Sequence, residues 1–161
     1  MNPVLSRWNA LGRPEAASEM ETMGGSRVWA ASMADARPIF DRERLHAAAE
    51  KSWAVLAAGD WEEAFGAHPQ IGDREVAGRE RREQAGVEAA SADTLAQLAD
   101  ANARYEARFG RVFLVCANGK SAQEMLALCL QRLQNDAQRE LTIAMEEQKR
   151  ITRLRLERWL A

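Results

Sequence analysis

The spacing of apolar residues constrains the fold of this chain more than any other feature. Apolar side chains recur at helical spacing in most segments, and apolar and polar residues nowhere alternate with period two over a useful length. Alanine and leucine dominate an apolar fraction of 47%, and β-branched residues are sparse. A chain of 161 residues can bury a real core within one domain. We therefore predict an all-α, single-domain bundle of about eight or nine helices over residues 1–161.

Residues that start and stop helices divide the chain. The predicted N-caps are Asn2, Asp41, Asp60, Ser91, Ser121 and Asp136. The first three helices are short and end before Pro38. They are therefore expected to cover the bundle rather than to form its framework. A longer helix is expected to run from Asp41 to Ala58, where Gly59 stops it, and the last and longest helix from Ala137 almost to Ala161. Trp53 and Trp61 recur at helical spacing with other apolar positions, so we expect them to be packing residues.

One short segment is predicted to be extended. The five apolar residues from Val112 to Cys116 are too few for a helix and suggest buried chain. A glycine turn at 117–120 follows, and then Ser121 with Glu124 forms a capping box. Free backbone N–H groups at such a junction can bind an anion, although a plain capped turn has the same sequence. A nucleotide-binding P-loop is excluded because Leu114 stands where that motif needs glycine.

Charge and composition exclude several classes of function. The net charge of −2 comes from mixed charges with no basic block, so no nucleic-acid partner is expected. No apolar leader and no run near twenty apolar residues are visible, which predicts a soluble, cytoplasmic protein without a membrane partner. Cys116 and Cys129 lie among apolar neighbours and are expected to be reduced core residues.

His68 is the first candidate for chemistry. Because Pro69 follows it, we expect the ring to project from a loop where a helix ends. Glu83 lies in a segment that is predicted to be helical, with Glu80 and Gln84 on the same face. A carboxylate that holds one ring nitrogen would fix the tautomer of the histidine, so His68 with Glu83 is a candidate acid/base pair. The alternative is a histidine that only ends a turn.

Two further residues complete the candidates from the sequence alone. Arg155 lies four residues from both Ile151 and Trp159, on an otherwise apolar stripe where a guanidinium needs a partner. It can hold a substrate, or snorkel from a helix edge and pair with a core glutamate. The other histidine, His46, is expected on the surface of a helix. With two histidines and no metal-binding spacing, no metal site is predicted.

Several motifs together resemble one enzyme family. These are HPQIGD, REQAG, FGRVFLVCANGKSAQEML, RLQND and KRITRLRLERWL, in that order, preceded by RPIFDRERL. They resemble the OHCU decarboxylases, which convert 2-oxo-4-hydroxy-4-carboxy-5-ureidoimidazoline into (S)-allantoin in purine breakdown. The resemblance covers most of the chain and fades before about Arg27, so residues 1–26 are weakly matched. It implies an all-helical fold, no cofactor or metal, a small anionic ureidoimidazoline as substrate and a possible homodimer.

The resemblance also implies roles for individual residues. His68 would be the catalytic histidine, Glu83 its acidic partner, and Arg155 the group that meets an anionic or carbonyl group. The implied substrate-binding residues are Pro69, Gln84, Val115, Cys116, Ala117, Asn118, Gly119 and Arg155, with Glu80 as a departure from the family pattern. The family usually has serine at position 80, and a carboxylate there would repel an anionic substrate unless a nearby arginine neutralises it. The main alternative to an enzyme is a non-catalytic helical interaction module.

Overall fold

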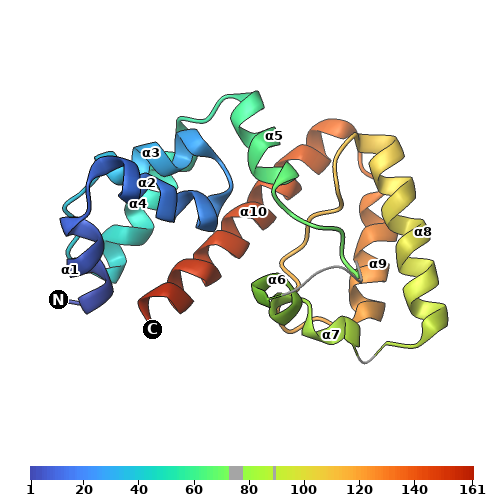
Figure 1. Ribbon diagram of the computed structural model, residues 1–161. Helices are drawn as coiled ribbons and strands as arrows, with labels where there is room; N and C mark the ends of the chain where they lie inside the picture. Colours follow the sequence, from blue (N-terminus) through green and yellow to red (C-terminus); the bar gives the residue numbers. More distant parts are fainter. Residues whose placement is uncertain (73–77, 89) are drawn as a thin grey trace. The chain divides into compact units, whose positions relative to one another are not determined.

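The computed structural model of the protein describes residues 1–72, 78–88 and 90–161 (Figure 1). Within these residues the chain forms ten helices and no strand, which confirms the all-α prediction. The helices are α1 Pro3–Ala10, α2 Arg13–Gly24, α3 Arg27–Asp35, α4 Arg42–Ala54, α5 Ala58–Gly66, α6 Gly78–Glu83, α7 Ala85–Glu88, α8 Ala92–Phe109, α9 Ala122–Arg132 and α10 Ala137–Leu160. The expected eight or nine helices become ten because the segment around Glu83 breaks into α6 and α7. None of the helices in the described parts of the chain is both long enough and apolar enough to span a membrane.

Local capping explains most of the helix ends. Asn2 Oδ1 accepts a hydrogen bond from the N–H of Val4 at 2.8 Å, and Ser91 and Ser121 cap α8 and α9 in the same way. Asp60 behaves differently from the prediction, because it lies inside α5 and accepts from the N–H of Ala57 at 2.9 Å. Gly59 therefore stands in the first turn of α5 and does not end α4. The first turn tolerates glycine because its N–H groups have no partner within the helix anyway.

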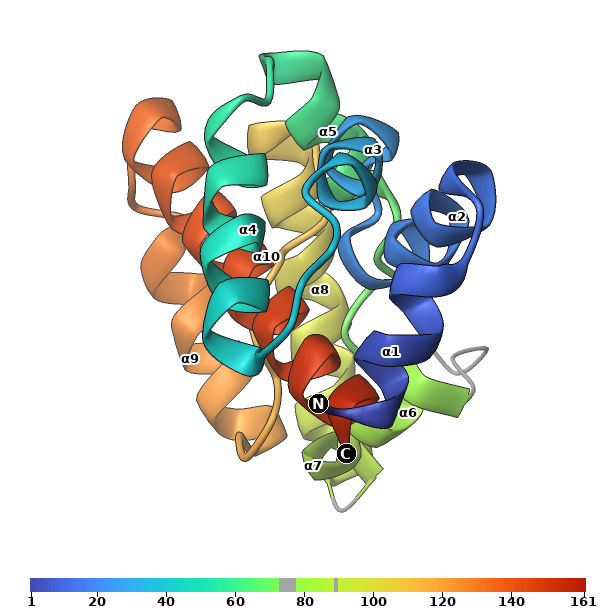
Figure 2. The ribbon, with the colours of Figure 1, turned by 90° about the vertical axis from the view of Figure 1, so that its left-hand side faces the viewer.

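Two compact units make up the chain, residues 1–64 with 149–161 and residues 65–148. In the first unit α2 packs against α3, and α3 against α4 (Figure 2). The rings of Trp29, Trp53 and Trp61 form a stack with 4.9 Å between successive centroids. This confirms that Trp53 and Trp61 are packing residues. The prediction of a single domain over residues 1–161 stays a prediction.

His46 contradicts its prediction as a surface residue. It lies on α4 with 8% of its surface exposed, and its Nε2 is 2.5 Å from Glu157 Oε1 on α10. Both residues belong to the first unit. Glu157 is more than a hundred positions further along the sequence, so the pattern of α4 alone gave no sign of this partner.

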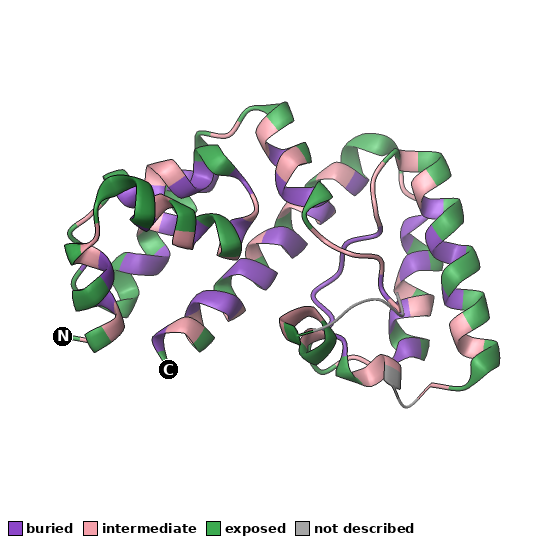
Figure 3. Cartoon of the chain, in the orientation of Figure 1, coloured by how far each residue is buried: buried purple, intermediate pink, exposed green. Residues whose placement is uncertain are grey.

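The second unit has its core between α8, α9 and the segment that joins them (Figures 1 and 3). Its buried apolar side chains are Ile71, Leu98, Ala101, Tyr105, Phe113, Val115, Ala117, Met125, Cys129 and Leu133. On α8, Leu98, Ala101, Asn102 and Tyr105 are buried, whereas Ala99 is exposed.

Candidate functional site

The end of α5 places His68 in the second unit. The helix ends at Gly66, and the N–H of His68 donates to the carbonyl of Phe65 at 3.3 Å. The histidine and Pro69 are both half-buried. On the ring, Nε2 lies 2.7 Å from Oε1 of Gln148, a residue of α10 with 0% of its surface exposed. A buried amide oxygen therefore orients the imidazole.

This contact decides which ring nitrogen carries the proton in the neutral form. An amide oxygen can only accept, so Nε2 donates to Gln148 and keeps its hydrogen. Gln148 was not predicted as a partner of His68; the pairing of His68 with Glu83 stays a prediction. The signal was present, since Gln148, Ile151 and Arg155 fall at i, i+3 and i+7 on α10 and share a face. A polar side chain on that apolar stripe becomes buried, so Gln148, like Arg155, needs a hydrogen-bond partner.

The turn after His68 is held by side chains of two helices. Asn102 donates from Nδ2 to the carbonyl of Ile71 at 3.0 Å, and the N–H of Gly72 donates to Gln84 Oε1 at 3.0 Å. Gly72 has φ of 86°, a left-handed conformation that favours glycine. Asp73, which was expected to complete the turn, lies outside the described residues. Gln84 is thus tied to the same turn that carries the histidine.

Glu80 and Glu83 share one arginine. Arg79 Nη2 lies 3.4 Å from Glu80 Oε1, and Arg79 Nε lies 3.5 Å from Glu83 Oε1. The neutralising arginine that Glu80 was expected to need is therefore present. The expected continuous helix is wrong, because α6 ends at Glu83 and Gln84 forms a turn before α7 begins.

The segment from Val112 to Ala117 forms neither a helix nor a strand, so side chains bind its backbone groups. Arg132 donates from Nη1 to the carbonyl of Leu114 at 2.7 Å. The N–H of Cys116 donates to Glu147 Oε2 at 3.4 Å, and Lys120 Nζ donates to the carbonyl of Cys116 at 2.9 Å. Residues 113–116 are buried, as predicted, but Val112 is only half-buried; Ala117 is buried too, and residues 118 and 119 are exposed. The capping box of Ser121 and Glu124 is confirmed.

The buried ion pair of Arg132 and Glu140 stabilises this segment. Glu140, with 0% of its surface exposed, accepts from Arg132 Nε at 2.7 Å and from the Tyr105 hydroxyl at 2.5 Å. Its other oxygen accepts from Asn135 Nδ2 at 3.0 Å. Burial, followed by the hydrogen bond to Glu140, raises the pKa of Tyr105, so the phenol stays a donor. The carboxylate is fully hydrogen-bonded, and through Arg132 it fixes the carbonyl of Leu114.

Gly86 brings the REQAG stretch against the glycine turn. A Cβ atom at this position would lie 2.1 Å from the carbonyl oxygen of Lys120, which no side chain can tolerate. The charges of Glu147 and Glu83 both act on the thiol of Cys116, after burial as the main cause of its raised pKa. These observations put Glu83, Cys116 and the turn at 117–120 in one neighbourhood.

Arg155 belongs to the first unit and is buried, with 6% of its surface exposed. Its Nη1 donates to the carbonyl of Met23 at 3.3 Å, and the hydroxyl of Thr152 donates to the same oxygen at 3.4 Å. The guanidinium therefore has a structural contact at the end of α2. A role of Arg155 beside His68 and Glu83 stays a prediction.

Comparison with known proteins identifies the family. Residues 9–157 match the sequence model of the family described as OHCU decarboxylase. The chain belongs to the OHCU decarboxylase family. The family match begins at residue 9, earlier than the sequence motifs indicated, and it includes every predicted site residue from His68 to Arg155.

Individual OHCU decarboxylase relatives agree with this assignment. The chain is 36% identical over 146 residues to the "Uric acid degradation bifunctional protein TTL" of Arabidopsis thaliana, a match that covers 86% of this chain and 45% of the relative. It is 30% identical over 137 residues to the 2-oxo-4-hydroxy-4-carboxy-5-ureidoimidazoline decarboxylase of Amia calva, covering 81% of this chain and 78% of that protein. The chain thus spans less than half of the Arabidopsis protein.

A solved structure of the family has the same fold. It is a crystal structure of an OHCU decarboxylase in the presence of (S)-allantoin, with a TM-score of 0.79 and 35% sequence identity. The match covers 87% of this chain and 95% of the other. Within the residues that the structure describes, no group of three or more histidine, cysteine or acidic side chains could hold a metal ion.

Proposed function

We propose that this protein decarboxylates 2-oxo-4-hydroxy-4-carboxy-5-ureidoimidazoline to (S)-allantoin without a cofactor. The observation that carries the proposal is the family match over residues 9–157, together with the solved relative crystallised in the presence of (S)-allantoin. The same match favours an enzyme over the alternative of a non-catalytic helical interaction module. A cytoplasmic location, a homodimer and the absence of nucleic-acid and membrane partners belong to this proposal.

The reaction defines what the site must do. The bond between the ring carbon and its carboxylate breaks, CO₂ leaves, and the electron pair delocalises into adjacent carbonyl and imine groups. One proton then adds to one face of that carbon, which gives a single enantiomer. A site that holds the carboxylate and stabilises the developing negative charge lowers the barrier, because these contacts are strongest in the transition state.

We assign proton transfer to His68. Gln148 keeps the ring in one orientation with the proton on Nε2. The entropy cost of orienting the imidazole is therefore not added to the reaction barrier. Glu83 is the proposed acidic partner, and Arg79, which pairs with both Glu83 and Glu80, limits the negative charge that the substrate meets. The predicted lining consists of Pro69, Gln84 and the backbone from Val115 to Gly119.

Arg155 is the proposed anchor for an anionic or carbonyl group of the substrate. Its replacement by alanine should raise KM more than it lowers kcat, because a guanidinium that only binds contributes equally to substrate and transition state. An unchanged KM in Arg155→Ala would remove this residue from the site.

The test of the function is direct. Purified protein is added to freshly generated substrate, the ultraviolet absorbance of the intermediate is followed, and circular dichroism reports the handedness of the allantoin. We expect decay faster than in buffer and an excess of the S enantiomer. A decay rate equal to that in buffer, with racemic product, would refute the proposal.

A further inference from the structure

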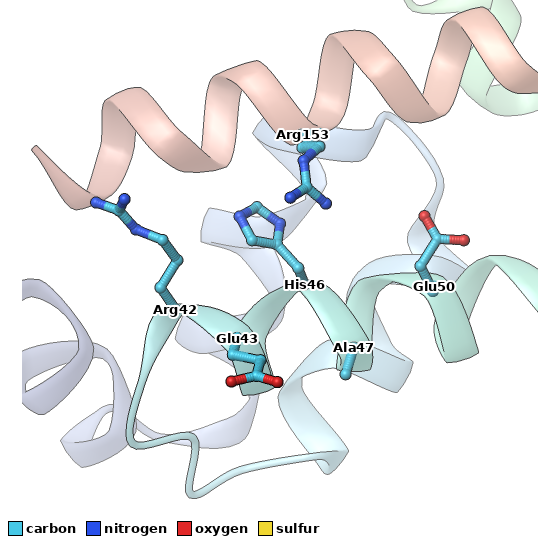
Figure 4. A pocket seen from close by; sticks show the side chains of 6 residues that line it. All are labelled: Arg42, Glu43, His46, Ala47, Glu50 and Arg153. Carbon is cyan, nitrogen blue, oxygen red and sulfur yellow. The ribbon is translucent and has the colours of Figure 1, made fainter.

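The first unit contains a second group of nitrogen-bearing side chains that the proposed reaction does not use. A hollow of about 550 Å³ lies against α4 and the part of α10 that belongs to the same unit. Its lining residues are Arg42, Glu43, His46, Ala47, Glu50 and Arg153. The volume is within the usual range for pockets that bind small molecules. Figure 4 shows this pocket from close by.

Four of these side chains lie between the two helices. Arg42, His46 and Glu50 point from α4 toward α10, and Arg153 points from α10 toward the ring of His46 (Figure 4). Glu43 and Ala47 point away from α10 (Figure 4). The side where the two helices face each other therefore carries three nitrogen-bearing groups, and its one carboxylate among the lining residues, that of Glu50, lies 3.6 Å from Lys149 Nζ.

Two of the nitrogen-bearing groups are available to a ligand. His46 uses Nε2 for Glu157, and among the described residues no hydrogen-bond partner reaches its Nδ1. Arg153 is exposed, and it forms no hydrogen bond or ion pair with any residue in the described part of the chain. A buried imidazole nitrogen beside an uncommitted guanidinium is suited to the oxygens of an anion.

The surrounding charges limit the ligand to one negative charge. From α4 the hollow is faced by Arg42, Glu43 and Glu50, and from α10 by Arg153, with Lys149 and Glu157 close by. Glu157 Oε2 lies 3.4 Å from Arg42 Nε, and Lys149 Nζ lies 3.6 Å from Glu50 Oε2. Three basic groups thus balance three acidic ones, and protonation of His46 adds a single positive charge.

We propose that this hollow binds a small organic monocarboxylate, held between the Arg153 guanidinium and Nδ1 of His46. The carboxylate is planar and accepts from the guanidinium of Arg153. It also accepts from Nδ1 when the His46 ring carries a proton on both nitrogens, so the ligand binds more tightly to the imidazolium form. A dianion is disfavoured because Glu43, Glu50 and Glu157 surround the site.

The experiment uses the imidazole itself as the probe. The chain has only two histidines, and a His68→Asn variant leaves the His46 ring signal alone in a ¹H–¹³C NMR spectrum. Propionate is titrated into the full chain at pH 5.5 and pH 8.0, because histidine side chains change charge in this interval. We expect a saturable shift of the His46 signal, with binding about two- to fivefold tighter at the lower pH, as for a partly exposed ion pair.

Matched variants and a second anion decide the outcome. Arg153→Ala should weaken binding of propionate, whereas Arg150→Ala, an exposed arginine of the same helix outside the hollow, should leave it unchanged. Sulfate, a dianion, should bind more weakly than propionate. No saturable shift, an undiminished response in Arg153→Ala, or tighter binding of sulfate would each overturn the proposal. The readout does not depend on decarboxylation, so the two proposals can fail separately.

Discussion

The two halves of α10 use polar side chains in different ways. Residues 137–148 lie in the second unit, where Glu140, Glu147 and Gln148 are all buried. Glu147 and Gln148 contact the predicted site residues Cys116 and His68, and Glu140 holds Arg132. Residues 149–160 lie in the first unit, where the partly exposed Glu157 contacts His46 and Arg42. Burial decides how much such a contact matters, because water competes with an exposed ion pair and cannot reach a buried one. We infer that the first half supports catalysis and the second half mainly local structure, with Arg155 as the proposed exception.

The largest expected difference concerns the two histidines that the halves of α10 contact: Gln148 of the first half contacts His68, and Glu157 of the second half contacts His46. His68→Ala should lower kcat about 10²–10⁴-fold, the usual range for general acid/base catalysis, while the helical circular dichroism stays unchanged. His46→Ala should keep turnover, since its ring contacts Glu157 and His46 is not among the predicted site residues. Turnover close to wild type in His68→Ala, measured by the ultraviolet decay, would contradict the catalytic assignment.

The buried ion pair of the second unit should dominate stability. Glu140→Ala leaves the Arg132 guanidinium buried without its carboxylate, and removing one partner of a buried pair typically costs about 3–5 kcal/mol in free energy of unfolding. Urea denaturation followed by circular dichroism measures the loss. Glu146→Ala, at an exposed position of the same helix, is the control and should change the free energy of unfolding by less than about 0.5 kcal/mol.

Replacing the amide that orients His68 tests the half of α10 that we connect to catalysis. Gln148→Leu fills the same space but leaves Nε2 without its acceptor, which costs about 1–3 kcal/mol, or roughly five- to 150-fold in kcat. The pH profile of kcat should shift as well, a change that a purely structural role would not cause. Gln138→Leu, on the exposed side of α10, is the matched control. If both variants kept the wild-type profile, Gln148 would not position the catalytic ring.

The smallest expected effect belongs to Glu157. The hydrogen bond from His46 is the main cause that lowers the pKa of this carboxyl below its ordinary value near 4.5, with smaller contributions from the charges of Arg42 and Arg153. Because the folded pKa is lowered, the stabilisation is present above about pH 4.5 and is lost as the pH falls through the folded pKa. Glu157→Gln should thus lower the free energy of unfolding by no more than about 1 kcal/mol at pH 7. The difference from wild type should shrink as the pH falls through the folded pKa.

Local signals in the sequence were sufficient for most helix boundaries. The caps at Asn2, Ser91 and Ser121 were predicted correctly because the side chain and the N–H that it accepts from are at most three residues apart. Gly59 was misread because glycine commonly follows the last turn of a helix, and only the position of Asp60 shows that it stands in a first turn here. The break at Gln84 depends on its contact with Gly72, which helical periodicity does not contain.

The candidate site was only partly predictable. His68 was identified from its type and from the proline that follows it, but its partner Gln148 lies 80 positions away, and sequence spacing does not report such distances. The same limit explains the error at His46, whose partner is 111 positions away. A general rule would have helped in the first case: every polar residue on an apolar helix stripe needs a named partner, and α10 carries Gln148 as well as Arg155 on that stripe.

The raised pKa of Cys116 has a practical consequence for handling the enzyme. Only the thiolate reacts readily with alkylating agents and oxidants, and burial keeps this sulfur in its thiol form near neutral pH. In the proposed site, this cysteine would therefore form no adduct with the substrate. We expect iodoacetamide to spare the folded protein and turnover to persist in buffers that contain no reducing agent.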